Sequence, residues 1–391
     1  MIGSAILRIY VAKAARVYVS GMLSILIPFY LAVLGYSAVF VGFALVAILA
    51  GNAFSNIALS YFERRLGRRR FLMVFSLLMV ASGIALVLGS GAAVILAACF
   101  LGNISTTGTE AGPFQSMEAG VLPDLTGGRA AQAFGRYNLV GYGASALGAL
   151  AAGAPGLAPG GFAVYRAFFF GFALAGAILF MVYSMLRSEE FSEPTKIPGL
   201  TRLAPSSRRD LTVISLLFSV DAFGGSFVSQ YVLSAYFLLT YQVQSEGLGI
   251  IFFVTSLIVA GSMYAAGRIA GRLGNLRTMV YTHLISNGFL IAIPLAGSLG
   301  GSLVFLFARQ SLSQMDVPTR QALMAEMFGR EELVTAFALT NTARSISSFA
   351  GGPVGTALLA SGLTGGLLLT AGASKVIYDC LVFAVYRRRF R

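Results

Sequence analysis

The 391-residue chain is 57% hydrophobic and only 11% charged, and its mean hydropathy is +0.80. Soluble globular domains carry about 25% charged residues, so this chain lacks the polar surface that a water-soluble globule of its size requires. Its formal net charge of +13 does not indicate a nucleic-acid partner, because the basic residues cluster in short segments between apolar runs. We therefore expect a protein embedded in the lipid bilayer.

Apolar stretches long enough to cross a bilayer, about 20 residues each, occur twelve times along the chain. The first group lies at 8–34, 37–61, 70–89, 92–117, 130–152 and 162–187. A second group lies at 210–240, 247–267, 276–297, 302–323, 332–360 and 365–387. The sequence thus predicts an all-α membrane protein of twelve transmembrane helices, with an N-terminal six-helix bundle (1–187), a cytoplasmic linker (188–209) and a C-terminal six-helix bundle (210–391).

Basic residues indicate the orientation of these spans. All but five of the 28 Lys and Arg residues lie in termini and turns that fall on one face if twelve spans alternate, and the opposite turns contain none. This assignment places Lys13 and Arg16 at the N-terminus and Arg320 after the tenth span. Because positively charged loops mark the cytoplasmic side, we expect a multi-pass protein of the plasma membrane with both termini in the cytoplasm.

The two halves of the sequence match each other at three places in the same order. Leu66–Arg70 matches Leu273–Arg277 at an offset of 207 residues. Ala133–Asn138 matches Ala336–Asn341 at an offset of 203, and Pro113 matches Pro318 at an offset of 205. Such matches indicate a duplicated six-helix unit. Two parallel repeats of this kind are expected of major facilitator transporters.

The segment after the second span resembles the loop signature of the major facilitator superfamily. It reads Glu63-Arg64-Arg65-Leu66-Gly67-Arg68-Arg69-Arg70, with Glu where the family usually has Asp. A degenerate copy reads Arg268-Ile269-Ala270-Gly271-Arg272-Leu273-Gly274. The resemblance covers nearly the whole chain. It implies a transporter in which this signature latches the cytoplasmic face in the outward-open state.

Two further segments resemble a substrate-unassigned or efflux-like branch of that family. Asp316–Gln321 resembles members without an assigned substrate, and Gly351–Gly355 resembles the glycine-proline motif of drug–proton antiporters. Asn103, however, stands in the region where those antiporters carry an arginine. Drug export is therefore one open interpretation.

A cytoplasmic gate is expected from charges at the inner ends of the spans. The alternative is a solvated network that sets topology only, and the same arginines can serve both roles. The candidate gate residues are Glu63, Arg64, Gly67, Arg68, Glu118, Asp316, Arg320 and Glu326.

Charges within the spans point to a substrate or coupling site. A charged side chain at mid-bilayer costs roughly 2.5–3.5 kcal/mol, so it normally faces a cavity or a partner. Lys375 and Asp379 share a helix face four residues apart, so they can neutralise each other, and a structural pair is one of the open interpretations. His283 is expected to have a packing role. Substrate contact and interhelical pairing stay open for the candidates Glu110, Arg136, Asn138, Asp221, Arg309, Asn341, Arg344, Lys375 and Asp379.

The function that fits these features is secondary active transport of a small organic solute by alternating access. We expect export, a solute that is an anion, a zwitterion or an amphiphile, and proton coupling through Asp221 or Glu110. The alternatives are a sensor or scaffold that transports nothing, and an uncoupled facilitator or importer of an organic anion. The partners are then the solute, the lipid bilayer and protons, with no nucleic acid, and the chain is expected to be a monomer.

An enzyme is not expected, because the sequence has no nucleophile–base arrangement and no phosphate-binding loop signature. Cys99 and Cys380 both fall inside predicted spans and have no metal-ligand neighbourhood. We therefore expect neither a cofactor nor a bound metal.

Overall fold

The computed structural model describes residues 2–109, 114–115, 117–118, 130–157, 162–186, 205–328 and 330–389. Within these ranges every regular element is a helix. The chain divides into two compact units. The N-terminal unit comprises Met1–Thr195 and Ser229–Ser256, and the C-terminal unit comprises Lys196–Val228 and Leu257–Arg391.

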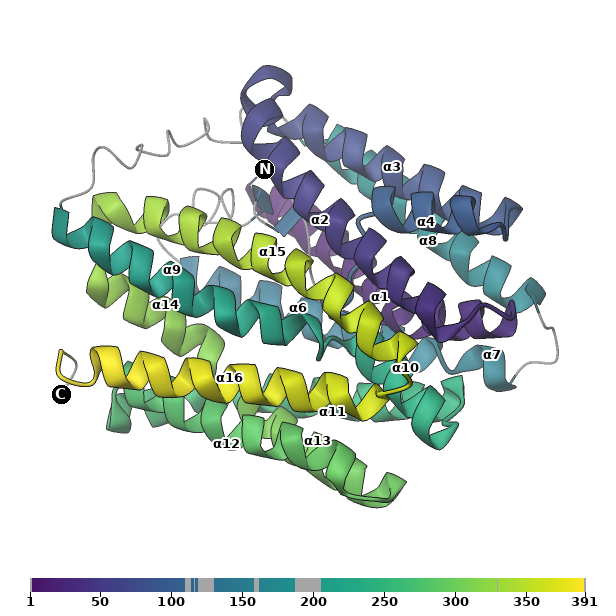
Figure 1. The fold of residues 1–391 in the computed structure, drawn as a ribbon. Coiled ribbons are helices and arrows are strands. Elements are labelled where there is room, and N and C mark those ends of the chain that lie inside the picture. Colours follow the sequence, from purple (N-terminus) through teal and green to yellow (C-terminus); the bar gives the residue numbers. More distant parts are fainter. Residues whose placement is uncertain are drawn as a thin grey trace. The chain divides into compact units, whose positions relative to one another are not determined.

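The N-terminal unit is built around its first helix. Its helices are α1 (Ile2–Val33), α2 (Ala38–Leu66), α3 (Arg68–Leu88), α4 (Ala92–Leu101), α6 (Ala130–Ala151), α7 (Ala154–Leu157), α8 (Phe162–Ser184), α10 (Gln230–Tyr241) and the first part of α11 (Ser245–Leu273). Helix α1 packs against α6, α8 and α10, while α3 packs against α8 (Figure 1).

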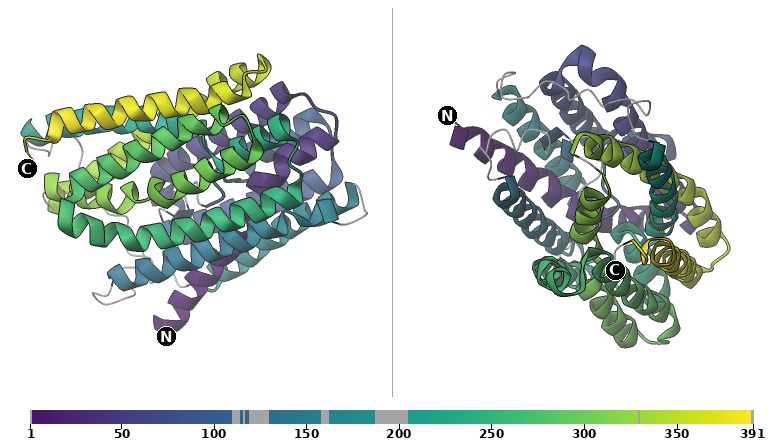
Figure 2. Two further views of the ribbon diagram at one scale, coloured as in Figure 1. Left: turned by 90° about the horizontal axis from the view of Figure 1, so that it is seen from below. Right: turned by 90° about the vertical axis from the view of Figure 1, so that its left-hand side faces the viewer.

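The C-terminal unit repeats this plan. Its helices are α9 (Pro205–Ser226), the second part of α11, α12 (Asn275–Leu295), α13 (Leu299–Ser313), α14 (Asp316–Met327), α15 (Arg330–Ala360) and α16 (Thr364–Tyr386). Helix α9 packs against α15 and α16, and α12 packs against α13, α14 and α16, which is yellow in Figure 2.

The helices have the apolar length and the outward-facing hydrophobic residues of membrane spans. In the described ranges, eight helical stretches are long and apolar enough to cross a bilayer, judged by length and composition. Large apolar side chains such as Leu88, Leu139 and Leu295 are 78%, 67% and 68% exposed. Water would penalise such surfaces, but lipid tails do not, so the exposed faces of these helices suit a bilayer.

The predicted duplication appears in both packing and backbone conformation. The first and fifth spans of the N-terminal unit pack together as α1 and α6, and their counterparts in the C-terminal unit pack together as α9 and α15. In the same way, the pair of α3 and α8 corresponds to the pair of α12 and α16. Gly67 precedes α3 with φ 75° and ψ 149°, and Gly274 precedes α12 with φ 81° and ψ 159°. Only glycine adopts this backbone region readily, so both halves conserve the same tight entry into their third span.

Three predicted spans are interrupted where the sequence predicted continuous helices. In the fourth predicted span, helix α4 ends at Leu101, and Asn103 just beyond it has a left-handed φ of 50°. The seventh breaks before Ser229, whose hydroxyl accepts a hydrogen bond from the Val232 N–H and starts α10. The tenth breaks between α13 and α14, which places Pro318 in the first turn of α14, where its missing N–H is not needed. A left-handed residue marks the first of these breaks and a capping serine the second.

A pair of glycines in α6 tests how closely α1 and α6 approach. A Cβ added to Gly148 would lie 1.9 Å from the Tyr18 carbonyl oxygen, whereas a Cβ at Gly143 would meet nothing within 4 Å. Both changes to alanine gain helix propensity, so their difference reports the contact alone. We expect Gly148→Ala to lower stability by about 1–3 kcal/mol through overpacking, with Gly143→Ala neutral or slightly stabilising. Thermal unfolding in detergent would measure both, and equal melting temperatures would contradict the close approach.

Candidate functional site

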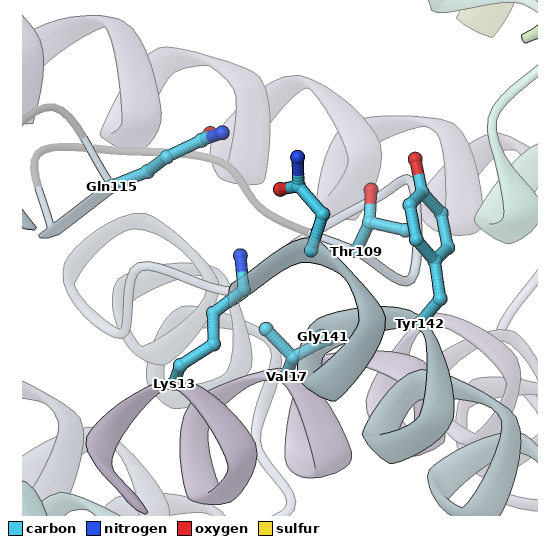
Figure 3. A pocket seen from close by; sticks show the side chains of 7 residues that line it. Lys13, Val17, Thr109, Gln115, Gly141 and Tyr142 are labelled. Carbon is cyan, nitrogen blue, oxygen red and sulfur yellow. The ribbon is translucent and has the colours of Figure 1, made fainter. Parts of the chain in front are cut away.

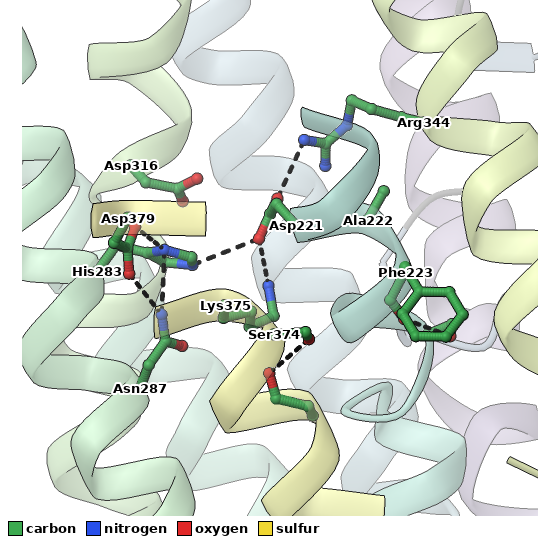
Figure 4. Close-up of polar contacts among 12 residues, drawn as sticks. Asp221, Ala222, Phe223, His283, Asn287, Asp316, Arg344, Ser374, Lys375 and Asp379 are labelled. Atoms are coloured by element: carbon green, nitrogen blue, oxygen red, sulfur yellow. Dashed lines mark hydrogen bonds and ion pairs between the residues drawn. The ribbon is translucent and has the colours of Figure 1, made fainter. Parts of the chain in front are cut away.

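A buried cluster of charges surrounds Asp221, in α9 of the C-terminal unit. Asp221 is 3% exposed. Lys375 of α16 donates to its Oδ1 at 2.5 Å, and Arg344 of α15 donates to its Oδ2 at 3.1 Å (Figure 4). The carboxylate thus binds cations from two neighbouring helices at once, and it joins α9, α15 and α16 electrostatically.

Arg320, in α14, adds a third cation to this cluster. Its Nη1 lies 3.4 Å from Asp221 Oδ2 and 3.2 Å from Asp316 Oδ2. The guanidinium carbons of Arg320 and Arg344 lie 5.4 Å and 6.0 Å from the centroid of the Phe218 ring. Cations within about 6 Å of an aromatic face are attracted by its quadrupole, so Phe218 helps to hold two like charges near one carboxylate.

His283, in α12, connects Asp221 to a second buried carboxylate. Its Nδ1 lies 2.8 Å from Asp379 Oδ1, and its Nε2 lies 3.7 Å from Asp221 Oδ1 (Figure 4). The Asn287 amide donates to Asp379 Oδ2 at 2.8 Å. Two carboxylates facing the two nitrogens of one imidazole form a path along which a proton can be held or passed.

Helix periodicity and one close approach bring these groups together. On α16 the buried stripe Ala371, Lys375, Tyr378 and Asp379 recurs at spacings of three or four residues, so both charges face the interior. Gly224 lies one turn beyond Asp221, and a Cβ there would lie 2.2 Å from the Ser374 hydroxyl oxygen. The missing side chain allows α9 to approach α16 closely enough for the short contact with Lys375.

The N-terminal unit contains a separate, fully satisfied ion pair. Glu118 is 2% exposed. Arg16 of α1 donates to its two oxygens at 3.1 Å and 2.7 Å, and the hydroxyls of Tyr137 and Tyr183 each donate at 2.6 Å. Charge-assisted, bidentate contacts of this kind are among the strongest hydrogen bonds in proteins. Glu118 is therefore held as a structural anion.

The two ion pairs occupy comparable positions of the repeat with reversed signs. Arg16 in the first span and Asp221 in the seventh differ by 205 in number, and Glu118 and Arg320 differ by 202. These offsets fall close to those of the sequence repeat. Each unit thus neutralises a buried charge between its first and fourth span, with the cation on the first span in one unit and on the fourth in the other.

A small cavity of about 80 Å³ lies in the N-terminal unit beside α1 and α6. Its polar lining comes from Lys13, Thr109, Gln115, Asn138 and Tyr142 (Figure 3). Lys13 is only 4% exposed, and its ammonium nitrogen lies 4.1 Å from the centroid of the Tyr137 ring. A buried ammonium together with hydroxyl and amide groups in its lining gives the cavity the chemistry of a site for a polar or anionic group.

The structure brings some predicted site residues together and leaves others apart. Asp221, Arg344, Lys375 and Asp379 join the C-terminal cluster. Arg309 is 7% exposed and lies on α13, the helix that precedes α14 in the chain. Elsewhere, Asn138 lines the cavity, the side chains of Arg136 and Asn341 are exposed, and Glu110 lies outside the described residues.

The predicted gate residues divide in the same way. Glu118, Asp316 and Arg320 belong to the buried networks, whereas Glu326 is exposed and accepts a hydrogen bond from Asn275 at 2.6 Å. Gly67 caps α3, and Arg68 follows it as a partly buried residue. The side chains of Glu63 and Arg64 lie outside the described part of the chain.

The structure corrects two expectations, the pairing of Lys375 with Asp379 and the packing role of His283. Lys375 and Asp379 do not neutralise each other, because Lys375 reaches Asp221 on α9 and Asp379 binds His283 and Asn287 on α12. His283 does not merely pack, because it contacts both carboxylates. In each case a partner on a neighbouring helix lies closer than the partner one turn away, and only the packing of the helices decides between them.

The basic residues Lys13, Arg16 and Arg320 were also misassigned to the flanks of spans. Lys13 and Arg16 are 4% and 5% exposed inside α1, and the Arg320 side chain is 15% exposed. Helix α1 begins at Ile2, so Lys13 and Arg16 lie several turns inside it. Two cations within one apolar run were the sequence signal that Lys13 and Arg16 are buried. No sequence signal indicated that the Tyr137 and Tyr183 hydroxyls contact Arg16.

Comparisons with known proteins agree with this architecture. The family model described as the Major Facilitator Superfamily matches residues 9–352. An uncharacterized membrane protein of Saccharomyces cerevisiae is 26% identical over 392 residues, which covers 88% of this chain and 86% of the relative.

Solved structures share the fold at low sequence identity. The nucleoside transporter NupG superposes with a TM-score of 0.77 at 10% identity, covering 98% of this chain and 100% of that one. The xylose transporter XylE from E. coli gives 0.75 at 14% identity, covering 98% and 96%. The human organic anion transporter MFSD10 gives 0.64 at 15% identity, covering 97% and 99%. These likenesses confirm the predicted twelve-helix fold.

Removing the anion of the N-terminal pair tests its structural role. Glu118→Gln would leave the buried Arg16 guanidinium without a counter-charge, so we expect a loss of about 3–5 kcal/mol in unfolding free energy. The matched control is Glu326→Gln, which alters an exposed carboxylate and should change stability by less than about 0.5 kcal/mol. Denaturation in detergent micelles would compare the two. Wild-type stability in Glu118→Gln would refute a structural role for this pair.

Proposed function

Since the chain belongs to the major facilitator superfamily and is a membrane transporter, we propose that it moves a small organic solute by alternating access, coupled to protons and in the direction of export. The support for coupling is the Asp221 cluster, in which one carboxylate neutralises cations on neighbouring helices and faces an imidazole. Intramembrane carboxylate and histidine groups are characteristic of proton relays in transporters.

Protonation of Asp221 gives a direct physical route from proton binding to helix movement. An ionised Asp221 holds Lys375 and Arg344 close together at 2.5 Å and 3.1 Å. A bound proton would cancel that charge and leave like charges facing each other in a medium of low dielectric constant. The state in which α15 and α16 move away from α9 would then be favoured, because a ligand shifts a conformational equilibrium by its differential affinity for two states.

His283 and Asp379 supply the proposed route for the proton. The imidazole lies between the two carboxylates, at 2.8 Å from Asp379 and 3.7 Å from Asp221. Its side chain is 5% exposed, so a proton held between the two carboxylates is shielded from bulk water. Asn287 fixes the Asp379 carboxylate from the same helix that carries His283, which keeps the relay aligned.

The direction, the gate and the location form part of the same proposal. The glycine-proline segment Gly351–Gly355, which resembles that of drug–proton antiporters, supports export. The gate is assigned to Glu63–Arg70 and Glu326, since Glu118, Asp316 and Arg320 take part in buried networks. The exposed arginines Arg70, Arg208 and Arg209 support a cytoplasmic face, and we assign the protein to the plasma membrane as a monomer.

An uncoupled facilitator or importer of an organic anion is the second candidate. The buried ammonium of Lys13 beside the cavity favours it, because an anionic group would be attracted there. The fold is shared with a D-xylose–proton symporter and with a human organic anion transporter, so it accommodates coupled transport and anion transport alike.

Solute-driven proton movement distinguishes the two candidates. Purified protein would be screened by thermal shift against a library of organic anions, zwitterions and amphiphiles. Stabilising compounds would then be added to proteoliposomes loaded with the pH dye pyranine. We expect such compounds to change the lumenal pH with wild-type protein and not with Asp221→Asn, which cannot bind the proton, although Asp221→Asn should still exchange labelled solute.

The control variant is Asp210→Asn, which lies on the same helix and pairs with Arg389 at a partly exposed site. It should behave as wild type. Uptake by wild-type protein without any lumenal pH change would favour the uncoupled candidate. Proton movement that persists in Asp221→Asn would contradict the proposed coupling residue.

A further inference from the structure

Arg309, in α13, is a buried cation that forms no ion pair with the C-terminal charge cluster. It is 7% exposed. Its Nη1 donates to the Gln310 side-chain oxygen at 3.0 Å, while its Nε is enclosed and has no hydrogen-bond partner. Among the described residues, no carboxylate lies within ion-pair distance of its guanidinium group.

Among the described residues, the other cations of the C-terminal cluster each have a carboxylate partner. Lys375 and Arg344 pair with Asp221, and Arg320 pairs with Asp316 as well as Asp221. The third carboxylate of the cluster, Asp379, is engaged by His283 and Asn287. Arg309 is therefore the remaining positive charge in the described part of this network. A bundle interior penalises such a charge unless a partner arrives to neutralise it.

The geometry of the guanidinium group shows which partner would fit. Gln310 accepts from Arg309 Nη1 and also from the Ser313 hydroxyl at 2.9 Å, so its amide oxygen is held on one side of the arginine. The opposite edge, formed by Nε and Nη2, makes no hydrogen bond to the described residues. Two parallel N–H groups on one edge of a guanidinium match the two oxygens of a carboxylate.

We propose that the transported solute carries a carboxylate group, and that the Nε–Nη2 edge of Arg309 binds it. This inference rests on the proposed transport function and narrows its substrate class from anions, zwitterions and amphiphiles to compounds with a carboxylate. Arg309 then acts as the residue that determines specificity for the anionic group. The Asp221 cluster remains available for proton exchange, because its own charges are paired internally.

The first test needs no knowledge of the solute. Arg309→Met removes an unneutralised buried charge and keeps an unbranched side chain, so purified Arg309→Met should melt several degrees above wild type in detergent. Arg320→Met is the matched control in the same span. It should melt below wild type, because it leaves Asp316 without its cation. A lower melting temperature for both variants would overturn the proposal by showing that Arg309 is held by partners of its own.

The second test measures the expected ligand chemistry with defined probes. Wild type, Arg309→Met and Arg309→Lys would be titrated with benzoate, phenylacetate, lactate and nicotinate, each paired with its neutral amide. At least one carboxylate should raise the melting temperature of wild type while its amide does not. That shift should vanish in Arg309→Met. In Arg309→Lys, where charge remains but the two-point contact is lost, the affinity should fall at least about tenfold.

These outcomes separate this inference from the proposed function. The absence of any carboxylate-specific shift in wild type, or a shift that survives in Arg309→Met, would overturn the carboxylate site. If proteoliposomes move only neutral or cationic solutes, the transport function stands and the carboxylate assignment fails. If carboxylates bind through Arg309 but no solute crosses the bilayer, the site stands and the transport function fails.

Discussion

A charge buried in a helix bundle is costly unless a group of opposite charge lies beside it. Asp221 meets this constraint through Lys375, Arg344 and Arg320, which come from α16, α15 and α14. Each contact joins a different helix to α9. One carboxylate therefore holds together much of the interior of its unit, and any event that changes its charge must be felt by several helices at once.

The two units solve this constraint differently, although they descend from one pattern. In the N-terminal unit, Glu118 is saturated by Arg16 and two tyrosine hydroxyls. In the C-terminal unit, Asp221 is shared among competing cations and adjoins His283. A saturated pair has little to gain from rearrangement, whereas a shared carboxylate can lose or gain partners. This difference suits the first network to anchoring and the second to the switching proposed for Asp221.

Local sequence patterns predicted the fold well, but they predicted poorly which buried charges pair with each other. Apolar run lengths located the spans, and the matching turns at Gly67 and Gly274 revealed the duplication that the backbone shares. The cost of intramembrane charge singled out Asp221 and Lys375 as site residues. Their pairing could not be predicted, because 154 residues separate them and the close approach at Gly224 leaves no periodic signal. The helix breaks were missed because Asn103 and Ser229 are ordinary polar residues until the backbone turns there.

The contact between Asp221 and Lys375 implies that the two charges stabilise each other across α9 and α16, which a double-mutant cycle would measure. Unfolding free energies would be measured in detergent for wild type, Asp221→Asn, Lys375→Met and the double variant. We expect the double variant to lose less stability than the two single variants together, with a coupling energy of about 1–3 kcal/mol. Strictly additive losses would contradict it, because they would show that each charge is neutralised independently of the other.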